Sequence, residues 1–332
     1  QKDVIQLKDY VFRAGENPAH RIIKNVYENI DNNSPESYSS YKCRYYSKSF
    51  FSSDVINDSL TNLAFLDTTT QKTEEDLGLF AFLSRQHIFL MESVIERFYK
   101  QKDRLYERVI ASKISGFSDP IFHLLTTELK SFSFYSDCFY ILGTPFENPI
   151  FDKKFKNYYF SLQDTLYDGA DTIFVVGFKP FPDKHFRALT GEIYVHSNQW
   201  AVQRVVVMPI FDTPRISILI EQNYHCLDSN RWFPSESNAK SSIDINPIVS
   251  YPISGYFRSL YSDVEIGIPI KNSLFVGGEL YVDTKQVDIK QSDLLLNQYR
   301  QDTIDERDKN TYLLWDTITQ SVNLDKFIYV LR

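Results

Sequence analysis

Few residues in this chain of 332 amino acids have the types and spacing that catalysis requires. The sequence contains no GxSxG nucleophile elbow, no Walker-type phosphate loop, no HExxH zinc motif and no GxGxxG fingerprint. Its six histidines are dispersed, and His123 and Glu128 are too far apart to share one helical face squarely. We therefore predict a protein that is not an enzyme and has no catalytic residues, metal ligands or cofactors. A hydrolase with paired carboxylates stays open as an alternative, because 43 acidic residues cannot be paired without geometry.

The acidic residues Asp164, Asp168 and Asp171 come nearest to a cation site. Hard cations such as calcium require several oxygen atoms that converge, and a turn can supply carboxylates and carbonyls together. However, Asp168-Gly169 is also an ordinary hairpin turn, and the spacing differs from that of an EF-hand. We interpret the group as a turn rather than a metal site.

Apolar side chains that alternate along the chain indicate a binding surface. Alternation places them on one face of a strand, and a concave sheet face can line a groove for an acyl chain, a lipoprotein or a hydrophobic peptide. An ordinary core under packed helices predicts the same alternation, so both interpretations stand. The candidate groove residues are Phe174, Val176, Phe178, Ile193, Val195, Ile216, Ile218 and Ile220.

Strands must position these side chains, and residues 157–236 predict a run of hairpins. Polar turns such as Asp168–Ala170 and Ser197–Trp200 separate stretches in which apolar and polar residues alternate. The 22 Tyr and 26 Phe, against 2 Met, also favour sheet over helix bundle. We therefore predict an antiparallel meander. Further strands are expected at residues 38–51, 88–99, 105–117, 256–266 and 274–282.

Helices are expected near both ends of the chain. Asn17 can cap a helix that has Pro18 in its first turn, and Thr303 with Glu306 forms the pattern of a capping box. The apolar stripe of the first helix consists of Ala19, Ile22, Ile23, Val26 and Ile30. The remaining stretches are predicted as a polar loop over 52–78, a short helix over 119–129 and irregular chain over 130–156.

Charge and cysteine content exclude several classes of partner and site. The net charge is −7 and no basic stripe is present, so we expect no nucleic-acid partner. Cys43, Cys138 and Cys226 are odd in number and far apart, which favours buried unpaired thiols, although one pair could bridge. No stretch has the roughly 20 apolar residues of a membrane helix. Because the chain opens at Gln1 without a signal-like apolar segment, we expect a processed or excised segment.

Three phrases in the predicted meander resemble a known fold. They are Gly191–Val195, Ala201–Val205 and Arg231–Pro234. Together with the order of strand pairs, they are similar to the lipoprotein-carrier fold of the outer-membrane lipoprotein-sorting proteins. The resemblance implies a mainly β (α+β) class, with an antiparallel half-barrel sheet and accessory helices that line or plug its concave face.

A second resemblance covers residues 20–320. It rests on phrases such as Leu90–Arg97, Ser112–Phe117, Ser131–Tyr135 and Trp315–Ile318. These are similar to a Bacteroidota family of unknown function that pairs a carboxypeptidase-regulatory-like domain with a surface-antigen-type barrel. The resemblance implies the periplasmic face of the outer membrane, within the cell envelope, and supplies no catalytic residues.

Together these observations predict a linker at residues 1–16, a half-barrel domain at 17–285 and a helical segment at 286–332 that leads towards a membrane barrel. The expected function is that of a noncatalytic periplasmic module of an outer-membrane-associated protein. Its expected partners are a lipid or lipoprotein, its own C-terminal membrane barrel, or other envelope proteins. The alternatives are an assembly scaffold without a small ligand and a cryptic hydrolase.

Overall fold

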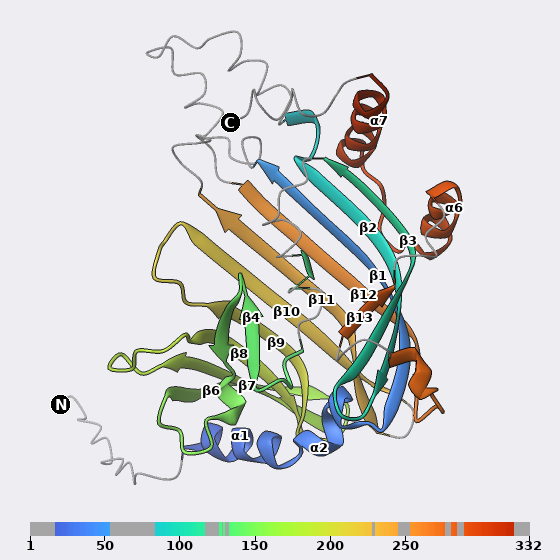
Figure 1. Cartoon of the computed structure of the whole chain (residues 1–332). Helices are drawn as coiled ribbons and strands as arrows, with labels where there is room; N and C mark the ends of the chain where they lie inside the picture. The colour runs from blue at the N-terminus through green and yellow to red at the C-terminus, as the bar shows by residue number, and fades with distance from the viewer. Residues whose placement is uncertain are drawn as a thin grey trace, which may run out of the picture.

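A curved sheet of eleven strands dominates the computed structural model (Figure 1). The structure describes residues 17–53, 84–116, 126–127, 129, 133–227, 230–244, 253–275, 280–283 and 289–321. The strands of the sheet are β1 (Ser40–Ser53), β2 (Phe89–Lys100), β3 (Arg104–Gly116), β6 (Tyr158–Asp168), β7 (Asp171–Pro180), β8 (Leu189–His196), β9 (Ala201–Pro209), β10 (Ile216–Leu227), β11 (Arg231–Ile243), β12 (Ile253–Ile266) and β13 (Leu280–Asp283).

The order across the sheet is β13-β3-β2-β1-β12-β11-β10-β9-β8-β7-β6. All neighbouring strands run antiparallel except β13, which pairs in parallel with β3. The first and last strands of this order do not pair with each other, so the sheet stays unclosed. The predicted mainly β class, with a large unclosed antiparallel sheet and accessory helices, is confirmed.

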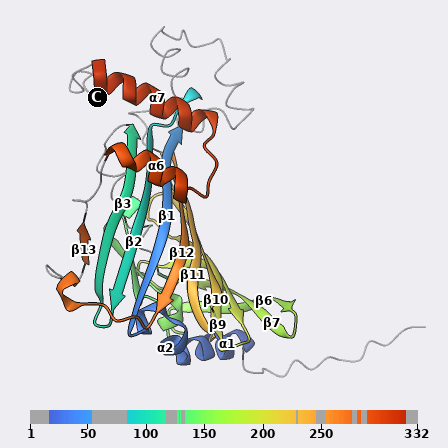
Figure 2. The ribbon, with the colours of Figure 1, turned by 90° about the vertical axis from the view of Figure 1, so that its right-hand side faces the viewer.

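The smaller elements lie on the two faces and at one end of the sheet. Helices α6 and α7 pack against β2 and β3 on one face, which we call the outer face (Figure 2). The hairpin of β4 and β5 belongs to the opposite face, which we call the inner face (Figure 1). The elements are α1 (Pro18–Glu28), α2 (Ile30–Asn33), η1 (Pro35–Ser37), β4 (Cys138–Ile141), β5 (Thr144–Glu147), η2 (Pro149–Phe151), η3 (Asn272–Phe275), α6 (Ile289–Tyr299) and α7 (Glu306–Ser321).

Helix α1 begins as the sequence predicts. The Asn17 side chain accepts a hydrogen bond from the Ala19 backbone N–H, and Pro18 occupies the first turn. The Asn17 amide also donates to the Phe160 carbonyl oxygen, which ties the helix start to edge strand β6. Four predicted stripe residues of α1 are buried in the main core, and Ile30 packs against the same core from α2.

Two predictions about local structure are wrong. Residues 138–147 were expected to be irregular, but they form the β4–β5 hairpin around Leu142 and Gly143. Both turn residues have positive φ, at 53° and 70°, as a type I′ turn requires. Leucine rarely occupies that position, so the usual Asn-Gly signal is missing.

The second error concerns the start of α7. The reciprocal hydrogen bonds of the capping box join Asp305 and Asp308, rather than Thr303 and Glu306. An aspartate at the third helical position therefore takes the role that glutamate usually has.

Other predictions are confirmed in part or lie outside the described residues. The strand predicted at 274–282 is divided between η3 and the short strand β13. Most of the helix predicted at 119–129 and of the loop predicted at 52–78 lies outside the described residues. None of the helices that the structure describes is long and apolar enough to cross a bilayer.

Candidate functional site

The eight candidate groove residues come together on the inner face of β7, β8 and β10. Six of them are at most 4% exposed and belong to one hydrophobic cluster, whereas Phe174 and Ile216 are half-buried at its margin. Cross-strand pairing brings Phe174 opposite Val195 and Val176 opposite Ile193. These eight residues therefore lie on one continuous apolar surface.

The β4–β5 segment covers this surface. Phe134, Phe139, Phe146 and Ile150 are buried in the same cluster as the groove residues. The apolar residues of α1 join the cluster next to β6. In the described part of the chain, six groove residues are thus the floor of a packed core, and residues 133–151 form its cover.

The contact between cover and sheet includes buried polar groups. The Phe134 N–H donates to Gln222 Oε1 (3.0 Å) and Tyr224 Oη (3.2 Å) on β10. The Val202 N–H on β9 donates to Tyr135 Oη at 2.9 Å. These hydrogen bonds hold the cover against the sheet in this covered state, because buried polar groups without partners destabilise a fold.

A row of small polar residues crosses the inner face beside the apolar surface. The strand register aligns its members across β10, β11, β12, β1, β2 and β3. Gln222 Nε2 donates to Ser237 Oγ at 2.9 Å, and Ser259 Oγ donates to Ser47 Oγ at 3.3 Å. All but the last member are buried. This serine row consists of Gln222, Ser237, Ser259, Ser47, Ser93 and Ser112.

The half-buried margin of the apolar surface is aromatic. The rings of Phe174 and Trp200 stack with centroids 5.8 Å apart and an interplanar angle of 12°. Trp200 has a φ of 55°, which the tight β8–β9 turn imposes. Trp232 is 3% exposed and lies within the core, next to His196. Of the two tryptophans, Trp232 is therefore a packing residue and Trp200 belongs to the margin.

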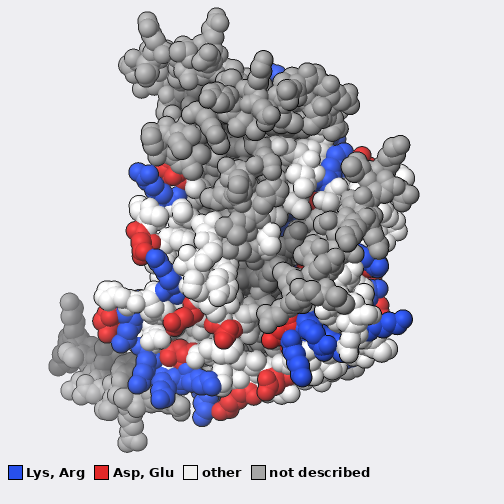
Figure 3. All heavy atoms as spheres, viewed as in Figure 1, with Lys and Arg blue, Asp and Glu red and all other residues white. Residues whose placement is uncertain are grey.

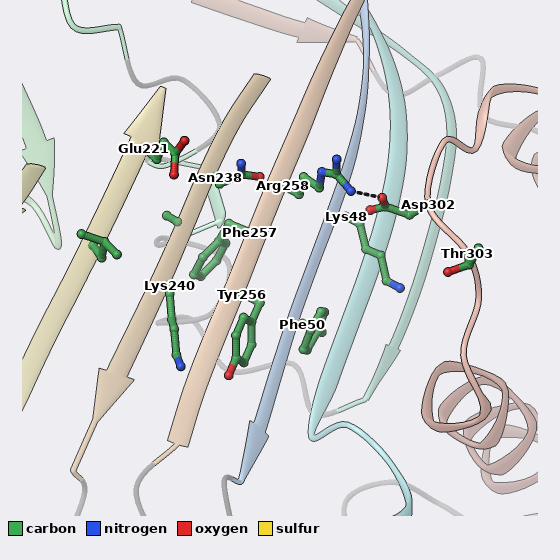
Figure 4. Close-up of a pocket in the computed structure, with 12 residues that line it drawn as sticks. Lys48, Phe50, Glu221, Asn238, Lys240, Tyr256, Phe257, Arg258, Asp302 and Thr303 are labelled. Atoms are coloured by element: carbon green, nitrogen blue, oxygen red, sulfur yellow. Dashed lines mark hydrogen bonds and ion pairs between the residues drawn. The ribbon is translucent and has the colours of Figure 1, made fainter. Parts of the chain in front are cut away.

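The outer face carries an open pocket of about 370 Å³ (Figure 4). Its floor consists of two rows of side chains that the register aligns across four strands. Its wall is the connection between α6 and α7, where Asp302 forms an ion pair with Arg258. One row is Phe50, Tyr256, Lys240 and Leu219. The other row is Lys48, Arg258, Asn238 and Glu221.

A buried charged cluster holds α6 and α7 against the sheet. Both oxygens of Glu92 accept hydrogen bonds from Arg300, each at 2.8 Å. Tyr46 and Tyr312 also donate to this carboxylate. Burial raises the pKa of Glu92, but the hydrogen bonds outweigh it and lower the pKa below its ordinary value.

A second buried group lies at the start of α7. Asp308 Oδ2 is 2.6 Å from Lys48 Nζ, and Asp308 Oδ1 is 3.2 Å from His87 Nε2. Burial raises the pKa of Asp308, yet the contacts with His87 and Lys48 lower it to about 2. His87, Asp305 and Asp308 have the spacing of a three-ligand metal group, but the Lys48 ammonium already neutralises the buried carboxylate.

The sequence did not lead us to predict that these charged residues form buried ion pairs. A signal was present, because the charged residues Glu92, Glu96 and Arg97 interrupt a strand that is mostly apolar. Charges inside such a strand indicate buried ion pairs, since an unpaired buried charge is very costly. The strand register was needed to identify the partners.

The cysteines and the acidic turn show no site in the described residues. The three cysteines form no disulfide among the described residues, and Cys43 is buried, Cys138 half-buried and Cys226 exposed, so the prediction of burial fails for Cys226. Burial raises the pKa of the Cys43 thiol to about 12, which makes it unreactive. The candidates Asp164, Asp168 and Asp171 form no ligand group among the described side chains.

Comparison with known proteins gives a family. A model described as a family of unknown function, DUF5686, matches residues 22–264. The chain belongs to this family. No curated protein matches the chain. The match covers β1 to β11 and most of β12, and therefore most of the DUF5686 sheet described above.

Solved structures give distant likenesses to this DUF5686 chain. A LolA-superfamily protein from Nitrosomonas europaea aligns with 8% identity and a TM-score of 0.32, covering 78% of this chain and 97% of the other. A DUF1329-family protein from Desulfovibrio piger aligns with 8% identity and a TM-score of 0.30, covering 77% and 97%. Lipovitellin aligns with 9% identity and a TM-score of 0.27, covering 85% and 33%. The fold assignment rests on the sheet itself.

Proposed function

We propose that this DUF5686 domain is a noncatalytic module of the cell envelope that binds a lipid or the acylated part of a lipoprotein on its inner face. We place it at the periplasmic face of the outer membrane, between a carboxypeptidase-regulatory-like domain and a membrane barrel of the same protein. The resemblance of residues 20–320 to the Bacteroidota family supports this placement.

The serine row is the observation that carries the proposal. Polar residues in register across six strands are uncommon on a face that serves only as a core, because a buried polar group destabilises the fold unless it is hydrogen-bonded. Here an apolar surface adjoins a row of hydroxyl and amide groups. An acylated ligand has the same two parts, because its hydrocarbon chain continues into an ester or amide.

Binding requires the cover to move away from the sheet. The polar contacts of Phe134 and Tyr135 with β9 and β10 suit such a movement. Water or the ligand's carbonyl groups can replace these hydrogen bonds when the cover leaves, whereas a purely apolar contact has no such replacement. The eight groove residues would then contact the acyl chain, with Phe174 at the entrance.

The filled inner face favours a second function, that of an assembly scaffold without a small ligand. In that case the cover never leaves, and partner proteins bind elsewhere on the sheet. The two functions differ in one measurable property, which is uptake of an acyl chain.

The test combines native mass spectrometry with lipid extraction of the purified chain, followed by titration with a fluorescent fatty acid. We expect a co-purifying acyl ligand and saturable uptake. Phe174→Glu should abolish uptake, because it places a charge at the half-buried entrance without altering the buried floor.

The matched control is Leu166→Glu. Leu166 lies on β6 opposite Ile173, so it points to the other face from Phe174. It is 41% exposed, so the substitution should leave both folding and uptake unchanged. A lipid-free mass together with no uptake from fatty acid or vesicles would refute lipid binding and favour the scaffold.

A further inference from the structure

The outer-face pocket combines stacked aromatic rings with cationic side chains. Phe50 and Tyr256 stack across β1 and β12, with ring centroids 4.9 Å apart and an interplanar angle of 21°. Figure 4 shows both rings on adjacent strands in line with Lys240. Together with the exposed side chain of Leu219, these rings make an apolar shelf beside the charged residues of the pocket.

Three cations surround this shelf, and two of them already have acidic partners. Lys48 pairs with Asp308 at 2.6 Å, and Arg258 pairs with Glu236 and Asp302. Lys240 differs from both. Within the described residues it has no carboxylate partner, and its ammonium lies 5.2 Å from the centroid of the Tyr256 ring.

The acidic residues of the pocket are likewise paired. Glu221 contacts Arg204 at 2.9 Å, and Asp302 contacts Arg258. Arg258 is shared by Glu236 and Asp302, so the four cations in and around the pocket balance four carboxylates. Each of these carboxylates already contacts another cation. Among the described residues, Lys240 is the pocket cation that no carboxylate contacts, and the Asn238 amide lies two residues away on the same strand face.

We propose that the pocket binds an anionic amphiphile, with a phosphate or carboxylate group held by Lys240 and a short apolar part on Tyr256, Phe50 and Leu219. A volume of about 370 Å³ suits a headgroup with a few attached carbon atoms rather than a whole lipid. The site lies on the opposite sheet face from the groove and does not depend on movement of the cover.

The location of the pocket links the ligand to the C-terminal helices. Asp302 belongs to the connection between α6 and α7, and it shares Arg258 with the pocket. A bound anion close to Arg258 weakens the hold of Asp302 on this guanidinium, because it adds a third negative charge to a cation that Glu236 and Asp302 already share. Ligand binding should therefore loosen the α6–α7 connection.

The test is calorimetric titration of the full chain with dihexanoyl phosphatidic acid below its micelle concentration. Inorganic phosphate and dihexanoyl phosphatidylcholine serve as probes of the two halves of the ligand. We expect the phosphatidic acid to bind, the other two to bind much more weakly, and Lys240→Gln to reduce affinity roughly tenfold.

The matched control variant is Lys179→Gln. Lys179 is also an exposed lysine beside a tyrosine ring, 5.9 Å from the centroid of Tyr159, but it lies on β7 outside the pocket. Leu219→Asp provides a second variant, because it introduces a negative charge on an exposed shelf residue and should also weaken binding.

Three results would overturn the proposal: equal affinity in Lys240→Gln, equal loss in Lys179→Gln, or binding of inorganic phosphate as tight as that of the amphiphile. Vesicles containing phosphatidic acid identify the source of the ligand. Binding to them that depends on Lys240 indicates a membrane lipid, and binding of the soluble probe alone indicates a free small molecule. Phe174→Glu should leave this binding intact, which separates the pocket from the proposed inner groove.

Discussion

Two regions of one sheet are stabilised in different ways. In strands β6 to β10, apolar side chains alternate with exposed ones and build a core under the β4–β5 hairpin. In strands β1 to β3, ion pairs are buried on both faces, with Arg97 and Glu107 on one face and Glu92 and Arg300 on the other. Burial of apolar area is insensitive to exact geometry, whereas a buried ion pair depends on every partner.

The exposed charges of the molecule form a separate group. Figure 3 shows Lys and Arg spheres next to Asp and Glu spheres along the lower and left margins of the described surface. Exposed pairs such as Arg187 and Asp212 lie in solvent and contribute little to stability. The charges that matter for folding are the buried ones in β1 to β3.

Arg300→Met is expected to have the largest effect on the charged region. This change leaves the buried Glu92 carboxylate with two tyrosine hydroxyl donors and no counter-charge, so we expect a loss of about 3–5 kcal/mol in the free energy of unfolding. Urea denaturation measures the loss, and hydrogen exchange should locate it in α6 and α7. The control Arg187→Met removes an exposed ion pair and should cost about 0–1 kcal/mol. Equal costs for the two variants would show that the charged cluster is not structural.

Acid pH should weaken the charged region selectively. The pKa of Asp308 falls from its ordinary value of 3.8 to about 2 in the folded chain. Its contribution to stability is therefore complete above pH 3.8 and is lost as the pH falls towards 2. We expect urea midpoints to drop over this window, and to drop less in Asp308→Asn, which has no such group to titrate. An identical drop in both proteins would contradict the assignment.

The smallest expected effect tests the cover of the apolar region. Tyr135→Phe removes the hydroxyl that accepts the Val202 N–H, which should cost about 1–2 kcal/mol. Hydrogen exchange of residues 133–151 should rise while that of α6 and α7 stays unchanged. Tyr140→Phe is the control, because Tyr140 is 62% exposed on the same hairpin. A rise across the whole sheet would mean that the cover and sheet unfold as one unit.

The apolar region was largely predictable from sequence. Alternation at Val176 and Phe178, and again at Ile218 and Ile220, indicated the strands and the side chains that share a face, but which face points inward was known only from the structure. The polar residues between these stretches also predicted the hairpin turns at the right positions. What alternation could not decide was whether this face is open or covered, because the cover comes from residues 133–151, whose turn lacks the usual signal.

The charged region and the outer pocket were not predictable in the same way. Lys48 and Asp308 are 260 positions apart, and Glu92 and Arg300 are 208 apart. The serine row and the Phe50–Tyr256 stack depend on the register of β1 against β12, so predicting them requires that register. A single sequence contains no signal for long-range register, so these features are evident only in the folded structure.

The pairing of β1 with β12 also has a consequence for the order in which the chain folds. Tyr41 pairs with Ile266, so the centre of the sheet joins residues that are more than 200 positions apart. Closing so long a loop is slow, whereas the hairpins from β6 to β11 close locally. We therefore expect the meander to form early. The β1–β2–β3 unit should join it later, and until then the edge of β1 that pairs with β12 is unpaired. During that delay the chain is most exposed to aggregation, and a chaperone would act on it there.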